Sequence, residues 1–213
     1  VQDVTEKLVK HSRNTMLIVV ANPLDVMAQV ALETSGFDSN RVMGMAGILD
    51  TARYRSFLAE EIGVSPKDIQ ALLLGGHGDT MVPLPRFTTV CGMPITQFID
   101  EDKLEEIVDR TKGGGGELVN LMGTSAWYAP GAAAAQMVEA IMLDQNRVFP
   151  CAAHLNGEYG QENLFLGVPV KLGKGGVKEI IEVDLNDEEQ QLLDESADHV
   201  HSVLKEFRQL MDK

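Results

Sequence analysis

The stretch Gly75-Gly76-His77-Gly78-Asp79-Thr80 directly follows an apolar run at residues 69–74, and this junction indicates the fold of the chain. The apolar run is typical of a buried strand, and glycines allow the backbone to turn sharply where a strand ends. A histidine at such a turn can meet a bound molecule and titrate near neutral pH. Taken alone, however, a histidine at a strand end is more often a structural or surface residue.

The residues before this turn predict strands that alternate with helices. The expected strands are 16–20 and 41–45, and the expected helices are 1–12, 24–34 and 49–62. Gly36 and Gly63 are placed to end the last two helices, because glycine readily adopts a left-handed closing conformation. This alternation predicts an α/β fold, the second half of a doubly wound parallel sheet.

After residue 68 the pattern predicts an α+β domain with an antiparallel sheet. The expected strands are 69–74, 81–90, 95–99, 147–155, 164–172 and 177–183, and the expected helices are 101–122, 129–144 and 186–212. Asn186 and Glu189 form a capping-box pattern at the start of the last helix. The four glycines at 113–116 are poor helix formers, so we expect two helices there with a kink or break between them.

Composition limits the function. The net charge of −14 disfavours nucleic-acid binding, which needs a basic surface. No apolar run reaches the ~20 residues of a membrane helix, and Cys91 and Cys151 do not form a disulfide framework. We expect a cytoplasmic protein. The acidic excess indicates either a soluble, solvated surface or adaptation to high salt.

Two motifs precede the histidine turn. Asn22-Pro23-Leu24-Asp25 follows a strand, and Leu49-Asp50-x-x-Arg53 opens a helix. With the Gly-Gly-His-Gly-Asp turn, and in this order, they resemble the lactate/malate dehydrogenase family, most closely its bacterial lactate-dehydrogenase-like malate dehydrogenases. The resemblance continues through residues 125–131 and 167–173 and covers nearly the whole chain.

The resemblance implies that His77 is the catalytic base and that Asp50 pairs with it. Arg53 lies three residues after Asp50 on the same helix face, and its guanidinium suits a bidentate grip on a substrate carboxylate. By resemblance, Asn22 binds the substrate and, with the backbone of Val20 and Ala21, borders the nicotinamide of NAD. Without the family, Asp50 could be a helix N-cap and Asn22 an ordinary turn residue before proline.

The glycine-rich fingerprint of a dinucleotide site, Gly-x-Gly-x-x-Gly after a strand, does not occur in the sequence. We therefore expect a C-terminal piece of a longer enzyme that lacks roughly the first hundred family residues. Residues 1–47 would be the remnant of an NAD-binding Rossmann domain, and 48–213 the substrate-binding, catalytic domain. The isolated piece is expected to be inactive.

The implied function is that of an NAD-dependent malate dehydrogenase, which interconverts (S)-malate and oxaloacetate in the tricarboxylic acid cycle. The alternatives are a lactate dehydrogenase of the same family or a truncated, non-catalytic form. A metal hydrolase built on His77 and Asp79 is disfavoured because a third ligand at usable spacing is missing, so we predict no metal. Helices at 24–34 and 129–144 are rich in small and apolar residues, which predicts a homo-oligomer, a tetramer or a dimer.

Overall fold

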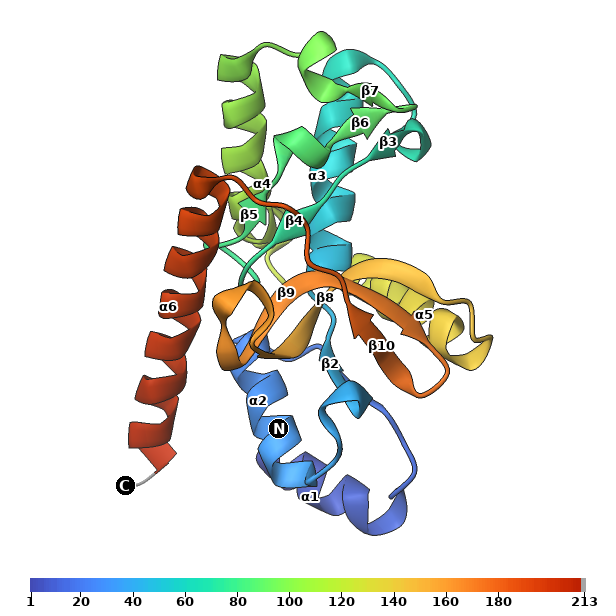
Figure 1. Cartoon of the computed structure of the whole chain (residues 1–213), viewed down its shortest axis with the longest axis vertical. Coiled ribbons are helices and arrows are strands. Elements are labelled where there is room, and N and C mark those ends of the chain that lie inside the picture. Colours follow the sequence, from blue (N-terminus) through green and yellow to red (C-terminus); the bar gives the residue numbers. More distant parts are fainter. Residues whose placement is uncertain (212–213) are drawn as a thin grey trace.

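A computed structural model describes residues 1–211, which fold around one mixed sheet flanked by helices (Figure 1). The α-helices are α1 (Gln2–His11), α2 (Leu24–Ser35), α3 (Gly47–Ile62), α4 (Glu101–Met122), α5 (Tyr128–Met142) and α6 (Asp187–Met211). The strands are β1 (Leu17–Val19), β2 (Val42–Gly44), β3 (Ile69–Gln70), β4 (Leu73–Leu74), β5 (Val82–Pro83), β6 (Thr89–Val90), β7 (Met93–Pro94), β8 (Arg147–Asn156), β9 (Glu162–Gly173) and β10 (Gly176–Ile180). Short 3-10 helices are η1 (Ser39–Arg41), η2 (Pro66–Asp68), η3 (Pro85–Phe87), η4 (Ile95–Gln97) and η5 (Glu158–Gly160).

The main sheet contains both predicted kinds of strand pairing. Its order is β1-β2-β8-β9-β10; β1 and β2 pair in parallel, and the other neighbours pair antiparallel. The predicted fold class is therefore confirmed. A single sheet joins the two predicted domains through Gly44, which lies opposite Ala152. A Cβ at Gly44 would come within 2.8 Å of the Ala152 Cβ, so a larger residue would push these strands apart.

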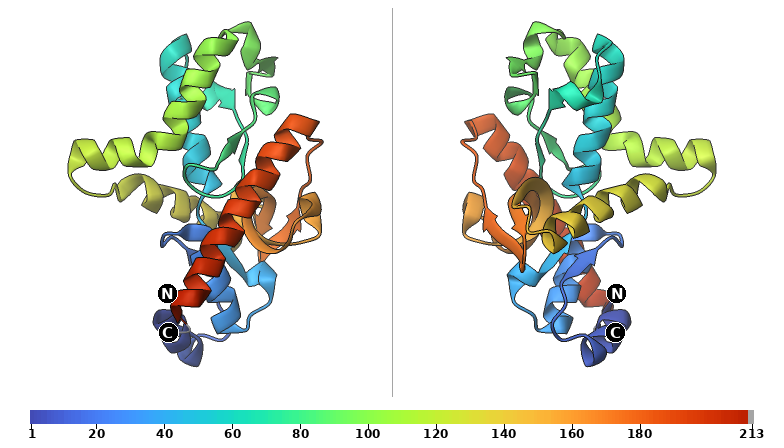
Figure 2. Two further views of the ribbon diagram at one scale, coloured as in Figure 1. Left: turned by 90° about the vertical axis from the view of Figure 1, so that its left-hand side faces the viewer. Right: turned by 90° about the vertical axis from the view of Figure 1, so that its right-hand side faces the viewer.

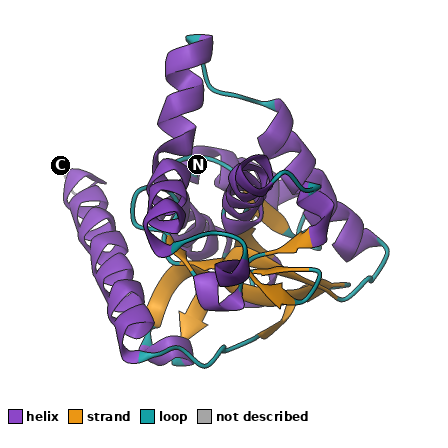
Figure 3. Ribbon diagram, turned by 90° about the horizontal axis from the view of Figure 1, so that it is seen from above, coloured by secondary structure: helices purple, strands orange, loops and turns teal. Residues whose placement is uncertain are grey.

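Helices α2 and α3 end as expected. Gly36 closes α2 and Gly63 closes α3, both with positive φ, 62° and 68°. At the other end of the chain, α6 runs along one flank, outside the strands (Figure 3). Its predicted capping box is confirmed: Asn186 Oδ1 accepts from the Glu189 backbone at 2.8 Å, and a Glu189 carboxylate oxygen accepts from the Asn186 backbone at 3.0 Å.

Three of the expected strands are wrong. The run at 69–74 is divided into β3 and β4, which belong to different sheets. The region 81–90 forms β5 and β6 with η3 between them, because Pro83 and Pro85 cannot donate ladder hydrogen bonds. Residues 95–99 begin with η4 and not with a strand. The apolar spacing of Ile95 and Ile99 is explained by burial of both side chains in the core beneath α3 and α4.

The glycines at 113–116 lie where α4 bends, so the expected kink is present, but the helix is not broken into two. The helix is continuous over 22 residues, and its axis changes direction about midway, so that the second half points away from the body (Figure 2). A hydrogen-bonded helix survives the poor propensity of glycine because tertiary packing supplies most helix stability in a folded protein. Gly114 itself is buried.

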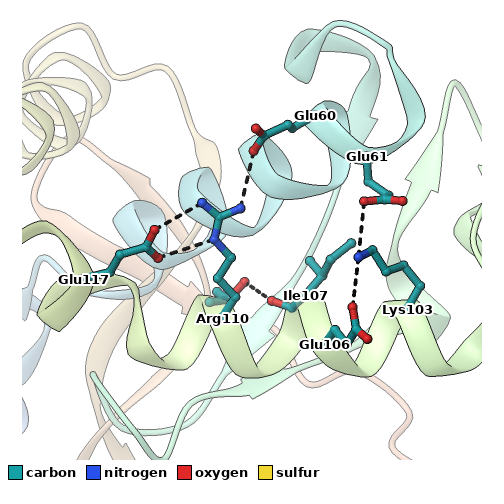
Figure 4. Close-up of polar contacts among 8 residues, drawn as sticks. Glu60, Glu61, Lys103, Glu106, Ile107, Arg110 and Glu117 are labelled. Carbon is teal, nitrogen blue, oxygen red and sulfur yellow. Dashed lines mark hydrogen bonds and ion pairs between the residues drawn. The ribbon is translucent and has the colours of Figure 1, made fainter.

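Ion pairs accompany the packing of the first half of α4 against α3 (Figure 4). Arg110 lies 3.4 Å from Glu60, and Lys103 lies 3.7 Å from Glu61. The Arg110 guanidinium also covers the ring of Phe57, with 4.0 Å to its centroid. These charges are exposed, so each pair contributes little, and the buried apolar side chains between the helices carry most of the stabilisation. The packing brings the α4 glycines next to α3.

Candidate functional site

The histidine turn is held by three different elements at three successive residues. Gly75 exchanges backbone hydrogen bonds with Gly167 of β9, at 2.9 and 3.0 Å. The backbone N–H of Gly76 donates to Ser196 Oγ of α6 at 2.8 Å, and that of His77 donates to Asp25 Oδ2 of α2 at 2.9 Å. The position of His77 is therefore fixed by the packing of β9, α6 and α2 around it.

His77, Asp50 and Arg53 form one connected polar group. His77 Nδ1 lies 2.7 Å from Asp50 Oδ2, and Arg53 Nη1 donates to Asp50 Oδ1 at 3.2 Å. Asp50 belongs to the first turn of α3, whose N-cap residue is Ala46, so the alternative role of Asp50 as an N-cap is wrong. Because a carboxylate only accepts, Nδ1 carries the hydrogen, and Nε2 is the nitrogen that can exchange a proton with a bound molecule.

Two opposing effects act on the protonation of His77. Burial lowers the pKa of His77, but the hydrogen bond and charge of Asp50 and the charge of Asp25 together outweigh it. Arg53 acts in the same direction as burial. The net result is a pKa above the ordinary value for histidine, which favours the imidazolium and suits a group that takes up a proton near neutral pH.

A cavity of about 430 Å³ brings most of the predicted residues together. Its lining includes Val20 and Asn22, from the segment between β1 and α2, together with Arg53 of α3 and His77. Ala21 is not among the lining residues, and Asp50 lies behind His77 with 3% of its side chain exposed. The cavity thus presents a titratable imidazole, a guanidinium and an amide to one molecule of small size.

Two glycines of α4 give Arg53 its place beside the cavity. A Cβ at Gly114 would lie 3.4 Å from Arg53 Cδ, and one at Gly115 would lie 3.8 Å from Arg53 Nη1. Arg53 Nε is buried and has no hydrogen-bond partner within residues 1–211. Asp50 accepts from Nη1 of Arg53, and the Arg53 side chain lines the cavity, so other N–H donors of the guanidinium remain for a bound carboxylate.

The segment before α5 also contributes. Ser125, Ala126 and Pro130 line the cavity, in agreement with the pocket wall that the resemblance implies for residues 125–131. Trp127, the residue before α5, is 67% exposed. Tyr128 is 87% exposed, so this end of α5 presents aromatic surface to its surroundings.

Sequence reasoning assigned no role to three residues that belong to the site. Asp25 and Ser196 hold the histidine turn, and Lys112 lines the cavity. The position of Asp25 in the Asn-Pro-Leu-Asp motif was the available signal, but an acid in the first turn of a helix is ordinary. Ser196 and Lys112 lie on amphipathic helices, where nothing in the sequence distinguishes them from surface residues.

Residues 1–211 present neither a cluster of metal ligands nor a membrane-spanning helix. No three side chains of histidine, cysteine, aspartate or glutamate in this range lie together in a way that could hold a metal ion. None of the described helices has the length and apolarity to span a bilayer.

Comparison with known families gives two matches that divide the chain. Residues 1–44 match the lactate/malate dehydrogenase NAD-binding domain, and residues 48–210 match the lactate/malate dehydrogenase alpha/beta C-terminal domain. The two matches together cover almost all of the described residues.

Individual relatives agree with the family matches. Malate dehydrogenase of Salinibacter ruber is 65% identical over 210 residues, which are 99% of this chain and 67% of that protein. The crystal structure of malate dehydrogenase from the same organism superposes with a TM-score of 0.97 at 64% identity, covering 99% of this chain and 69% of the other. Lactate dehydrogenase of Eimeria maxima with NADH and oxamate superposes at 0.96 with 39% identity, covering 99% and 66%. The chain thus spans about two thirds of the length of these relatives.

Proposed function

Because the chain belongs to the lactate/malate dehydrogenase family, we propose that it forms the catalytic portion of an NAD-dependent malate dehydrogenase. The observation that carries the proposal is the His77–Asp50–Arg53 group facing a cavity that Val20 and Asn22 also line. Oxidation of a 2-hydroxy acid needs a base for the hydroxyl proton and a cation for the carboxylate. This group provides both.

In this proposal each side chain has one task. His77 Nε2 takes the hydroxyl proton of malate, and Asp50 stabilises the imidazolium that results. Arg53 binds the carboxylate next to the reacting carbon through two parallel N–H donors. Asn22 donates its amide hydrogens to the substrate oxygen. In the reverse direction His77 returns the proton to the carbonyl oxygen of oxaloacetate.

NAD, when bound, supplies the hydride acceptor. The residues at the carboxyl end of β1 fit the nicotinamide end of this cofactor, because ligands of doubly wound sheets bind at that edge. Val20 is 45% exposed there and offers an apolar surface for a flat ring, beside the Asn22 amide. The roles proposed for this chain concern the nicotinamide side of the cofactor.

The substrate assignment is tested by comparing two 2-oxo acids. A full-length enzyme that contains this chain should reduce oxaloacetate with NADH far better than pyruvate. Preference for pyruvate would change the proposed substrate from malate to lactate, while the assignment to the family would still hold. The 213-residue chain alone is expected to show neither activity nor saturable NADH fluorescence, and activity of the chain alone would contradict this part of the proposal.

Asp50→Asn should move the pH profile of malate oxidation. Asp50 favours the imidazolium, so its loss lowers the pKa of His77 and the neutral imidazole persists to lower pH. The acid limb of kcat/KM should shift downward by roughly one unit or more. The exposed Asp68, changed to asparagine, serves as the control and should leave the limb in place. An unshifted profile in the Asp50 variant would argue against its pairing with His77.

We also propose that the enzyme is a cytoplasmic homo-oligomer, a dimer or a tetramer. The apolar residues of α2 do not support this, because Leu24, Val26 and Ala28 are buried within the chain itself. The support comes from α5, where Val138 is 47% exposed and Met142 is 73% exposed. Light scattering of the full-length enzyme at micromolar concentration tests the proposal, and a monomeric mass would refute it.

The charge of −14 predicts a dependence on salt. Acidic residues at the start of α4 are exposed, namely Asp100, Glu101, Asp102, Glu105 and Glu106. Their repulsion weakens as the Debye length falls from ~10 Å at 0.1 M to ~3 Å at 1 M salt. Melting temperature and oligomer mass should both rise between these sodium chloride concentrations. A flat or falling melting temperature would leave solubility as the only effect of the acidic excess.

A further inference from the structure

The backbone of the histidine turn has an unusual partner at His77. The neighbouring residues are held by neutral groups, Gly75 by the backbone of Gly167 and Gly76 by the Ser196 hydroxyl. His77 alone is held by a carboxylate, Oδ2 of Asp25, at 2.9 Å. A neutral acceptor such as asparagine or serine could hold the same N–H, so the hydrogen bond by itself does not explain the charge.

The environment of the Asp25 carboxylate is unfavourable for a charged group. Asp25 is 5% exposed, and its second oxygen, Oδ1, is buried without a hydrogen-bond partner anywhere in residues 1–211. Leaving such an oxygen unpaired is unfavourable for folding. The first turn of α2, with its partial positive charge, offsets only part of this. A charge kept under these conditions points to a task in the adjacent site.

We propose that Asp25 is a positioning residue for His77. The Asp25 carboxylate ties the His77 backbone to the turn that carries Asn22 and holds a negative charge near the imidazole. The inference rests on the proposed role of His77 as the proton-exchanging group. Asp25 itself does not line the cavity, so it acts through His77 and does not touch the substrate.

The contact between Asp25 and His77 matters because Asp25 lies on the same turn as Asn22. Asn22 and Asp25 are three residues apart on one turn that enters α2 from β1. Asn22 lines the cavity, while Asp25 binds the backbone of His77. The carboxylate therefore fixes the relative position of two groups that face the same bound molecule, although they come from separate parts of the sequence. Small displacements between such groups are costly for catalysis.

The charge of Asp25 also has a measurable effect, because it raises the pKa of His77. Burial raises the pKa of Asp25 to about 6, against the lowering by the His77 N–H and charge, so the group is mostly ionised at pH 7.5. Its charge adds to that of Asp50 in raising the pKa of His77, while Arg53 of α3 opposes both. The other charged groups at the cavity are Asp79, on the same turn, and Lys112 of α4. The residue of α6 that contacts the turn is Ser196, which is neutral.

NMR of the 213-residue chain with labelled histidine tests the proposal without any turnover. The His77 resonance is assigned by its loss in His77→Asn. Asp25→Asn should lower the pKa of His77 by roughly 0.5–1 unit. Ser196→Ala removes the neighbouring hydrogen bond without changing any charge, and it should leave that pKa in place. A folded Asp25→Asn chain with an unchanged His77 pKa would overturn the proposal, and so would an equal shift in Ser196→Ala.

A second measurement does not depend on the folding of the Asp25 variant. In His77→Asn, the amide of residue 77 should still donate to Asp25, and its proton shift should follow the protonation of that carboxylate, with a midpoint above that of the parent chain because the lowering charge of His77 is gone. An amide shift that is constant from pH 5 to pH 8 would contradict the contact. Both measurements can fail while His77 remains essential for turnover, so this inference and the proposed function fail separately.

Discussion

Turnover of the full-length enzyme is expected to fall by roughly 10²–10⁴-fold when His77 is replaced by asparagine, the usual worth of a positioned acid–base group. Asparagine keeps the backbone N–H that Asp25 accepts and can still reach Asp50, so the turn should stay folded. What is lost is the nitrogen that takes and returns the proton. Steady-state rates with saturating NADH and oxaloacetate measure the effect.

His201→Asn is the matched control for this prediction. His201 is exposed on α6, away from the residues that line the cavity. Its replacement should leave turnover unchanged, and the circular dichroism of both variants should match that of the parent enzyme. A His77 variant that keeps more than a tenth of the parent turnover would show that another group moves the proton.

The second large effect is expected from Arg53→Lys. A lysine retains the positive charge but cannot form two parallel hydrogen bonds to one carboxylate. Loss of one charge-assisted hydrogen bond costs about 1.5–3 kcal/mol, so KM for oxaloacetate should rise roughly 10- to 100-fold. The turnover number at saturation should change much less, because the interaction exists before and during the reaction.

Arg55→Lys gives the control for charge and size. Arg55 lies two residues further along α3 and donates to the Pro66 carbonyl, so it points away from the cavity. Its replacement should leave KM unaltered. If Arg53→Lys instead lowers turnover and leaves KM unchanged, Arg53 acts mainly in the transition state and the assigned role in substrate binding is incorrect.

The sequence predicted those parts of the fold in which local signals and tertiary packing agree. The glycines after α2 and α3 ended both helices, and the long strands β8 and β9 formed the antiparallel pair that their turns indicated. It failed where tertiary contacts decide. The glycines of α4 mark the expected kink, but the helix continues through them as one element, packed against α3 over its first half. The prolines near residue 85 divided an apolar run that reads as one strand.

For the site, the outcome follows the same rule. His77, Asp50 and Arg53 occur in motifs with fixed spacing, and the structure brings them into contact. Asp25 was within a quoted motif, but its partner is 52 residues away, and only the folded chain shows their hydrogen bond. Ser196 is further still, at 120 residues from Gly76.

We propose that one substrate molecule is held between Arg53 and His77 while NAD lies on the Asn22 side. A crystal structure of the full-length enzyme with NADH and an unreactive 2-oxo dicarboxylate analogue tests it most directly. We predict two hydrogen bonds from the Arg53 guanidinium to the carboxylate beside the oxo carbon, a hydrogen bond from His77 Nε2 to the oxo oxygen, and the nicotinamide against Val20 and Asn22. An analogue bound with its carboxylate away from Arg53, or with His77 out of hydrogen-bond range of the oxo oxygen, would overturn this placement.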